Sequence, residues 1–192
     1  MGQLIEIRWH ARGGQGAKTA AILLAEAAQA AGKYIQGFPE YGPERMGAPI
    51  RAFNRISDAP ITIHGSVEQP DVVVVLDPTL IGKAPIAEGF PPHGVLLVNT
   101  PKAPSDIRRK IGLEGGKVFT VDASKISVEE MGRDIPNAPM MGALMRVSRI
   151  MDYEEFLKVT REQMEHKFRN KPEVVEGNIR AIERAYREVT GE

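Results

Sequence analysis

The chain has 192 residues, with 25 Lys and Arg balanced by 25 Asp and Glu, so its formal net charge is zero. This balance gives no electrostatic case for binding nucleic acid or an anionic membrane surface. The chain has no cysteine, which excludes disulfides, a thiol nucleophile and a Cys-ligated iron–sulfur cluster within it.

No apolar run approaches the ~20 residues needed to span a bilayer. The N-terminus lacks a signal-peptide pattern, so we predict a cytoplasmic protein. The histidines are scattered and lack metal-ligand spacing, which predicts no metal site in this chain; they are His10, His64, His93 and His166.

The first element is predicted to be a strand over residues 5–10, where apolar and polar residues alternate. A glycine-rich turn, Arg12-Gly13-Gly14-Gln15-Gly16, interrupts the alternation. From Ala17 the sequence is rich in helix formers and ends at Gly32, a plausible C′ glycine. A strand, a glycine turn and a helix leave free backbone N–H groups at the start of the helix, which is an anion-binding arrangement.

The glycine turn matches no nucleotide fingerprint fully. Gly13 and Gly16 fill two places of the dinucleotide pattern G-x-G-x-x-G, but Ala11 stands at the first place. The acid expected roughly 20 residues on would be Glu40, which lies in a predicted loop rather than at a strand end. A P-loop needs a Gly-Lys pair, and here Ala17 separates Gly16 from the lysine. Two interpretations remain: the glycines bind phosphate or another anion, or they only allow close packing of helix and strand.

A short second strand is predicted over residues 33–36, followed by an irregular loop over residues 37–49. Three glycines and three prolines argue against regular structure through most of this loop. Its aromatic and charged residues are typical of a loop that lines a site or contacts a partner; a surface loop held by its own Phe38 and Tyr41 is the alternative.

A hairpin is predicted from the alternating segment 50–56, a turn cluster at 57–60 and an extended segment 61–64. Arg51 and Arg55 would share one face, which we expect to be solvated.

Three further strands are predicted at residues 71–77, 95–98 and 117–121, the first two rich in valine and leucine. Four consecutive valines indicate burial on both faces, as in the centre of a parallel sheet. These strands end near Asp77, Asn99 and Asp122, which would place polar groups along one sheet edge, where open α/β sheets bind ligands. Asp77 is a candidate for either a helix cap or a ligand contact.

The remaining sequence is predicted to be helical. A short helix starts near Ser105, a second starts at Asn137 as its cap and reaches Ile150, and charged amphipathic helices follow at 153–168 and 172–189. We therefore expect a single α/β domain over residues 1–192, with a core at 1–150 and a helical extension at 151–192.

Four segments in this order resemble the gamma subunits of the 2-oxoacid:ferredoxin oxidoreductases, and most of all those acting on pyruvate. They are RWHARGGQGAKTAA, GKYIQGFPEYGPERMGAPIRAFNRIS, PDVVVVLDPTL and NAPMMGAL. The resemblance covers nearly all of residues 3–150. The family usually has glycine where this chain has Ala11. The resemblance implies a three-layer α/β/α domain with a mostly parallel Rossmann-like sheet.

The resemblance also implies a place in a complex that converts pyruvate, coenzyme A and oxidised ferredoxin to acetyl-CoA, CO₂ and reduced ferredoxin. Thiamine diphosphate with Mg would belong to the alpha and beta chains, and 4Fe-4S clusters to the delta and beta chains. Coenzyme A handling would fall to the gamma chain, through Gly13, Gly14, Gln15 and Gly16. The loop facing a neighbouring subunit would comprise Phe38, Pro39, Glu40, Tyr41, Gly42, Pro43, Glu44 and Arg45.

No base–nucleophile pair stands out, so we expect no catalytic residue in this chain; cofactors carry the chemistry and the protein positions them. Three alternatives stay open. The substrate can instead be 2-oxoisovalerate or 2-oxoglutarate in a related complex, the chain can be a purely architectural subunit without a ligand, or it can be a free-standing dinucleotide-binding enzyme.

Overall fold

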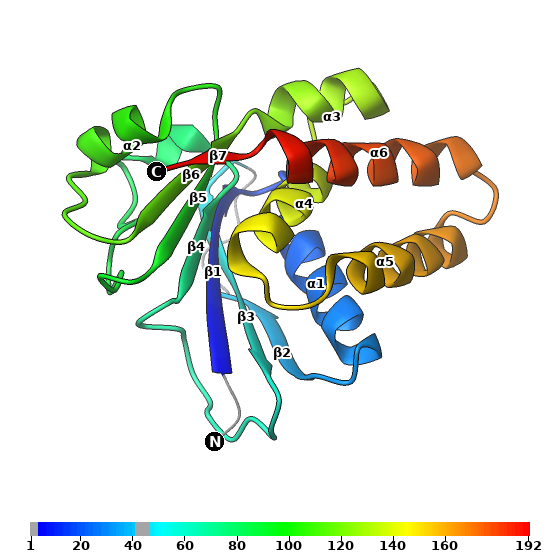
Figure 1. Ribbon diagram of the computed structural model, residues 1–192, viewed down its shortest axis with the longest axis horizontal. Coiled ribbons are helices and arrows are strands. Elements are labelled where there is room, and N and C mark those ends of the chain that lie inside the picture. Colours follow the sequence, from blue (N-terminus) through cyan, green and yellow to red (C-terminus); the bar gives the residue numbers. More distant parts are fainter. Residues whose placement is uncertain (1–3, 41–46) are drawn as a thin grey trace.

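The computed structural model describes residues 4–40 and 47–192, which form one seven-stranded sheet with helices on both sides (Figure 1). The strand order is β2-β3-β1-β4-β5-β6-β7. The four central strands are parallel, and β2, β3 and β7 run antiparallel to their neighbours. The strands are β1 Leu4–Arg12, β2 Tyr34–Pro39, β3 Pro49–Ser57, β4 Val72–Val75, β5 Val95–Asn99, β6 Lys117–Val121 and β7 Thr190–Gly191.

Helices cover the two faces of the sheet unequally. Figure 1 shows α1, α4, α5 and α6 on one side of the sheet and α2 on the other. The helical segments are α1 Ala17–Ala30, the 3-10 turn η1 Pro78–Leu80, α2 Pro104–Ile111, α3 Ala123–Met131, α4 Asn137–Ser148, α5 Tyr153–Lys167 and α6 Pro172–Glu188. This arrangement confirms the predicted α/β/α layers. In the described part of the chain, no helix is long and apolar enough to cross a membrane.

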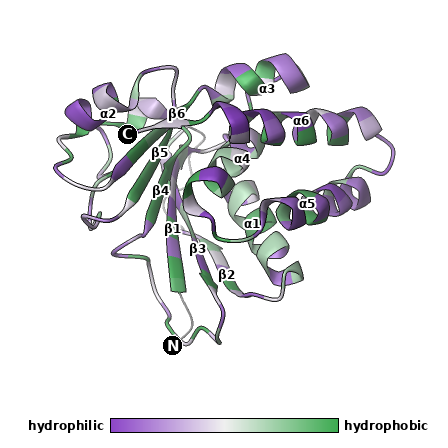
Figure 2. Ribbon diagram, viewed as in Figure 1, coloured by the Kyte–Doolittle hydropathy of each residue, from purple (hydrophilic) through white to green (hydrophobic). Residues whose placement is uncertain are grey.

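The valine run of β4 explains why the sheet has a core on each face. Val72 and Val74 pack into the large core beneath α1, α4 and α6, whereas Val73 and Val75 pack into a smaller core with Leu80 and neighbouring residues. All four are buried. Because side chains alternate across a strand, a run of four valines serves both layers. In Figure 2 the ribbons of β4 and β5 are largely hydrophobic, whereas α2 and α6 carry hydrophilic stretches.

The end of α1 matches the sequence-based prediction. Ala31 is the C-cap, and Gly32 follows with φ 76°. The Gly32 N–H donates to Gln29 O at 2.9 Å and the Lys33 N–H to Ala28 O at 3.0 Å. These two bonds are a Schellman motif, in which glycine adopts the left-handed conformation without steric cost.

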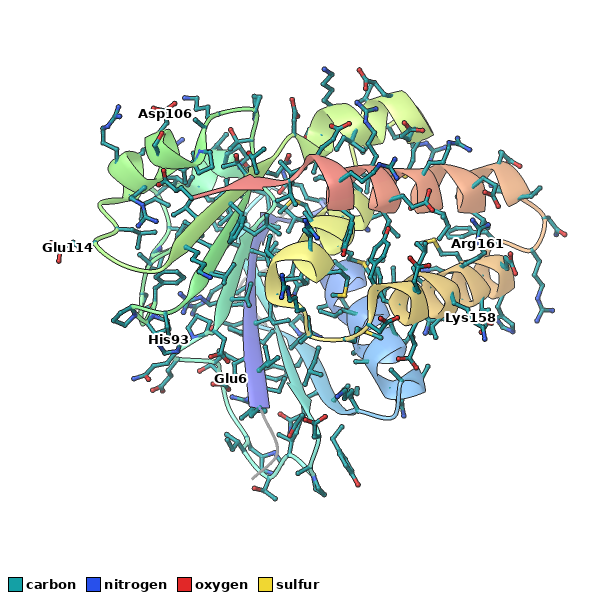
Figure 3. The ribbon with its side chains drawn as sticks, in the orientation of Figure 1. Glu6, His93, Asp106, Glu114, Lys158 and Arg161 are labelled. Atoms are coloured by element: carbon teal, nitrogen blue, oxygen red, sulfur yellow. The ribbon has the colours of Figure 1, made fainter. Side chains whose placement is uncertain are left out.

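The C-terminal helices pack on the same layer as α1. Helix α6 lies against α4, where a Cβ on Gly142 would overlap the Ile182 carbonyl oxygen, so the glycine permits this close approach. Arg161 of α5 pairs with Glu176 of α6, and Figure 3 shows it between the two helices. Strand β7 then pairs with β6 at the sheet edge.

The predicted hairpin is wrong. Residues 61–64 form no strand, because both edges of β3 are already paired, one with β1 and the other with β2. The hairpin is made instead by β2 and β3. Strand β2 extends through Gly37, Phe38 and Pro39, which the composition had placed in the irregular loop.

The prediction that Arg51 and Arg55 share a solvated face of β3 is also wrong for Arg55. Its side chain is 2% exposed and its Nε donates to Glu6 Oε1 at 2.6 Å. The Gly65 and Ser66 carbonyls accept from the same guanidinium, because the segment after β3 folds over this face. Arg51 remains partly exposed and pairs with Glu40.

Candidate anion-binding site

The glycine loop lies where the parallel strands end. It follows β1 and leads directly into α1, while Asp77, Asn99 and Asp122 lie at or just beyond the ends of β4, β5 and β6. The predicted polar edge is therefore present. Asp77 caps η1 by accepting from the Thr79 N–H, and Asp122 caps α3 by accepting from the Lys125 N–H.

Two glycines in the loop adopt backbone angles that other residues rarely take. Gly14 has φ 97° and Gly16 has φ 84°, in the region where a β-carbon is strained. A Cβ on Gly14 would meet nothing within 4 Å, whereas one on Gly16 would lie 2.9 Å from Asn137 Nδ2. Gly14 thus keeps the loop turned outward at an open surface, and Gly16 lets the start of α4 approach.

The N–H groups of the loop fall into two kinds: some donate to backbone carbonyls, and others have no acceptor among the described residues. The Gly13 N–H donates to Ala48 O and the Gln15 N–H to Arg12 O, both at 3.1 Å. Within residues 4–40 and 47–192, the N–H groups of Gly14 and Gly16 have no hydrogen-bond acceptor. Helix α1 starts after Gly16 without a side-chain cap, so its first N–H groups also lack partners in the part of the chain that the structure describes. These amides form a positive end that favours an anion.

The side chain of Gln15 does not point to this open surface. Its Oε1 accepts from the Arg12 N–H at 2.7 Å, and its Nε2 donates to Asp77 Oδ2 at 3.0 Å. Of the four predicted loop residues, Gly14 and Gly16 therefore have N–H groups without an acceptor in the described chain, and Gly13 and Gln15 hold the loop in place.

Asp77 is a charged anchor beneath the loop. Its side chain is 8% exposed and Oδ2 lies 3.0 Å from Arg12 Nε. Burial raises the pKa of Asp77, but hydrogen bonds from Thr79 and Gln15 and the positive charge of Arg12 outweigh it, so the pKa is lowered. The carboxylate stays ionised, and Arg12 neutralises its charge.

Lys18 places a further positive charge in the first turn of α1. The side chain is exposed, and the first turn contains no acidic residue. In the described part of the chain Lys18 makes no ion pair. A cation at a helix N-terminus is unfavourable unless an anion is bound there.

Asn137 also lies at the loop, which the sequence-based reasoning missed. It was expected to cap α4, but Pro136 is the N-cap and Asn137 is the first helical residue. Its Oδ1 accepts from the Ala138 N–H, which leaves Nδ2 beside Gly16. No local pattern indicates this contact, because it depends on how α4 packs against α1.

The loop expected to face a partner is described only at its start. Phe38 packs against Phe53 with ring centroids 5.4 Å apart, and Glu40 pairs with Arg51. Phe38 and Pro39 end β2 at the sheet edge, and Glu40 follows directly. Tyr41, Gly42, Pro43, Glu44 and Arg45 lie outside the described residues.

Comparison with known proteins identifies the family. The model of the family described as pyruvate ferredoxin/flavodoxin oxidoreductase matches residues 6–188. The chain belongs to this family. A relative within it, pyruvate synthase subunit PorC from Thermotoga maritima, is 53% identical over 184 residues, covering 96% of this chain and 94% of the relative.

Two further similarities extend over the whole chain. The common gamma subunit of the pyruvate/ketoisovalerate oxidoreductases from Pyrococcus furiosus is 40% identical, covering 95% of this chain and 96% of that subunit. The crystal structure of PORC from Thermotoga maritima, a pyruvate oxidoreductase subunit, superposes with a TM-score of 0.87 at 49% identity and covers 99% of both chains. The α/β fold of this chain is therefore that of the pyruvate ferredoxin/flavodoxin oxidoreductase family.

Proposed function

We propose that this chain is the gamma subunit of a cytoplasmic pyruvate:ferredoxin oxidoreductase, which converts pyruvate, coenzyme A and oxidised ferredoxin to acetyl-CoA, CO₂ and reduced ferredoxin. Full-length similarity to pyruvate synthase subunit PorC supports this assignment. Alpha, beta and delta subunits would carry the thiamine diphosphate, Mg and 4Fe-4S clusters. The absence of cysteine in this chain is compatible with that division.

Within the complex, the glycine loop would bind a phosphate of coenzyme A. The observation that carries this proposal is the set of amides at Gly14, Gly16 and the start of α1 that have no acceptor in the described part of the chain, with Lys18 in the same first turn. Amides at a helix N-terminus and a nearby cation are what an anionic phosphate needs. The chain would perform no bond chemistry; it would hold coenzyme A so that its thiol reaches the acyl group on a neighbouring subunit.

The loop at residues 38–45 would face one of these neighbours. Phe38 and Pro39 end β2, an edge strand of the sheet, and Glu40 follows them into the rest of this loop. An edge strand and an aromatic side chain are common at protein interfaces.

A different 2-oxoacid is the second candidate. The relative from Pyrococcus furiosus is named as common to pyruvate and ketoisovalerate oxidoreductases, so a gamma subunit of this kind serves more than one acid. A purely architectural subunit without a ligand is the remaining alternative, and the following experiment separates it from the proposal.

The test uses the assembled complex with three variants. Gly14→Asp adds a carboxylate at the open surface of the loop, Gly14→Asn adds a neutral side chain of similar size, and Gly32→Asp adds the same charge at the other end of α1. The two glycines lie at opposite ends of a 14-residue helix, about 21 Å apart at 1.5 Å per residue. Both have positive φ, and at both a Cβ would lie in open space.

We expect Gly14→Asp to raise the KM for coenzyme A by about 30- to 100-fold, since like charges about 5 Å apart repel by roughly 2–3 kcal/mol at a protein surface. Gly14→Asn should raise it by less than about fivefold, and Gly32→Asp should leave it unchanged. The KM for pyruvate should stay constant in all three. An unchanged KM for coenzyme A in Gly14→Asp would support the architectural alternative.

A further inference from the structure

The side chain of Gln15 joins the glycine loop to the centre of the sheet. Its Oε1 accepts from the Arg12 N–H at the end of β1, and its Nε2 donates to Asp77 Oδ2 beyond the end of β4. One amide thus spans two neighbouring parallel strands. Because it uses both of its ends, the side chain is held in one orientation, and the loop backbone is held with it.

Asp77 is suited to anchor this contact because its own position is fixed. Its Oδ1 accepts from the Thr79 N–H at 2.8 Å, and its Oδ2 lies 3.0 Å from Arg12 Nε. It follows β4, whose residues are all buried. The carboxylate is therefore rigid, and the Arg12 charge beside it prevents it from repelling an anion at the loop.

Arg12 holds the opposite side of the loop. Its Nη1 donates to Gly47 O at 2.9 Å and its Nη2 to Thr79 Oγ1 at 3.2 Å. The Gly13 N–H adds a bond to Ala48 O. The loop is thus tied on one side to the residues that precede β3 and on the other to those that follow β4. With these ties in place Gly14 stays exposed, and the N–H groups of Gly14 and Gly16 have no acceptor among residues 4–40 and 47–192.

We propose that Gln15 and Asp77 are positioning residues, which keep the glycine loop in the conformation that binds the anion without contacting it. This inference rests on the proposed binding of coenzyme A at the loop. Preorganised donors bind an anion more tightly than mobile ones, because the cost of ordering them is already met in the free protein. Without the hydrogen bond between Gln15 and Asp77, the loop would sample other conformations and the affinity for coenzyme A would fall.

The experiment uses the assembled complex and pairs each variant with a matched control. Gln15→Met keeps the length of the side chain but removes both hydrogen bonds; its control is Gln29→Met, on the exposed face of α1. Asp77→Asn keeps the cap on η1 but places an N–H₂ where Arg12 and Gln15 donate. Its control is Asp122→Asn, another strand-end aspartate that caps a helix on the same edge.

We expect Gln15→Met and Asp77→Asn each to raise the KM for coenzyme A about tenfold, while the KM for pyruvate and the kcat at saturating coenzyme A change less than twofold. Both controls should match the unmodified complex. Gln15→Ala, which also lacks the hydrogen bonds, should match Gln15→Met, so that a packing defect of the methionine is recognised.

Two results would overturn the inference. If Gln15→Met and Asp77→Asn leave the KM for coenzyme A unchanged while Gly14→Asp raises it, the loop binds coenzyme A but does not depend on Gln15 and Asp77 for its conformation. If the KM values for coenzyme A and pyruvate rise together, or the variants lower kcat alone, the two residues have a general structural role. An unchanged KM for coenzyme A in Gly14→Asp as well would refute the proposed function itself.

Discussion

Because His10 is buried, we expect the protein to lose stability in mild acid. It lies on β1 with 2% of its surface exposed, and its Nε2 accepts a hydrogen bond from Arg8 Nε at 3.1 Å. Burial, followed by the positive charges of Arg8 and Arg51, lowers the pKa of His10 to about 3. Glu40 and Glu88 also face this cluster, but each pairs with Arg51, so His10 gains no close carboxylate partner among the described residues.

The direction of the pH effect follows from this shift. In the unfolded chain His10 takes up a proton near pH 6.5, whereas in the folded protein it stays neutral down to about pH 3. Its contribution to stability is therefore complete above pH 6.5 and is lost as the pH falls from 6.5 toward 3. Each pH unit in this window costs about 1.4 kcal/mol, so the loss at pH 5 is about 2 kcal/mol.

Urea unfolding of the isolated chain at pH 7.5, 6 and 5 measures this loss. Other acidic groups also change stability with pH, so the chain is compared with His10→Gln, in which an amide oxygen accepts the hydrogen bond from Arg8 but does not titrate. The free energy of unfolding should fall more steeply with decreasing pH for the natural chain, by about 1.4 kcal/mol per unit. Parallel curves for the two proteins would refute the reasoning.

Two further predictions concern packing between distant segments. Gly142→Ala places a methyl group against the Ile182 carbonyl and should lower the free energy of unfolding in urea by about 3 kcal/mol; a loss below about 1 kcal/mol would mean that α4 and α6 adjust easily. Arg55→Leu removes a buried guanidinium that donates hydrogen bonds to Glu6, Gln36 and Gly65. This substitution should lower the free energy of unfolding in urea by about 3 kcal/mol. A neutral effect there would show that the carbonyls and Glu6 are satisfied by water.

The sequence predicted those parts of the fold that depend on local pattern. The valine run identified β4, the glycine turn located the junction of β1 and α1, and Gly32 marked the end of α1. Each of these features depends on residues close together in the chain. The strand ends at Asp77, Asn99 and Asp122 were predictable for the same reason, since parallel strands share one edge.

Features that depend on distant segments were not predictable in this way. Alternation in β1 and β3 gave no sign that Arg8 and Arg55 are buried, because the residues that cover them come from other parts of the chain: Ile86 and Glu88 over Arg8, and Gly65 and Ser66 over Arg55. The failed hairpin has a similar cause, since β1 and β2 occupy the edges of β3.

In the candidate site, too, the local features were predictable from the sequence and the long-range contacts were not. The loop glycines were evident from sequence, but the contacts of Gln15 with Asp77 and of Gly16 with Asn137 join residues about 60 and 120 positions apart. The close approach of Gly16 to Asn137 is what the packing interpretation expects, whereas the contact of Gln15 with Asp77 is what the proposed anion-binding loop would use to hold its conformation.

Amide hydrogen exchange of the assembled complex, with and without saturating coenzyme A, tests the central claim most directly. The claim is that N–H groups from Gly14 through the first turn of α1 bind an anionic group of coenzyme A. The peptide covering residues 13–20 should exchange more slowly when coenzyme A is present, and the peptide at the other end of α1 should not change. Unchanged exchange at residues 13–20, under conditions where coenzyme A is turned over, would contradict the account.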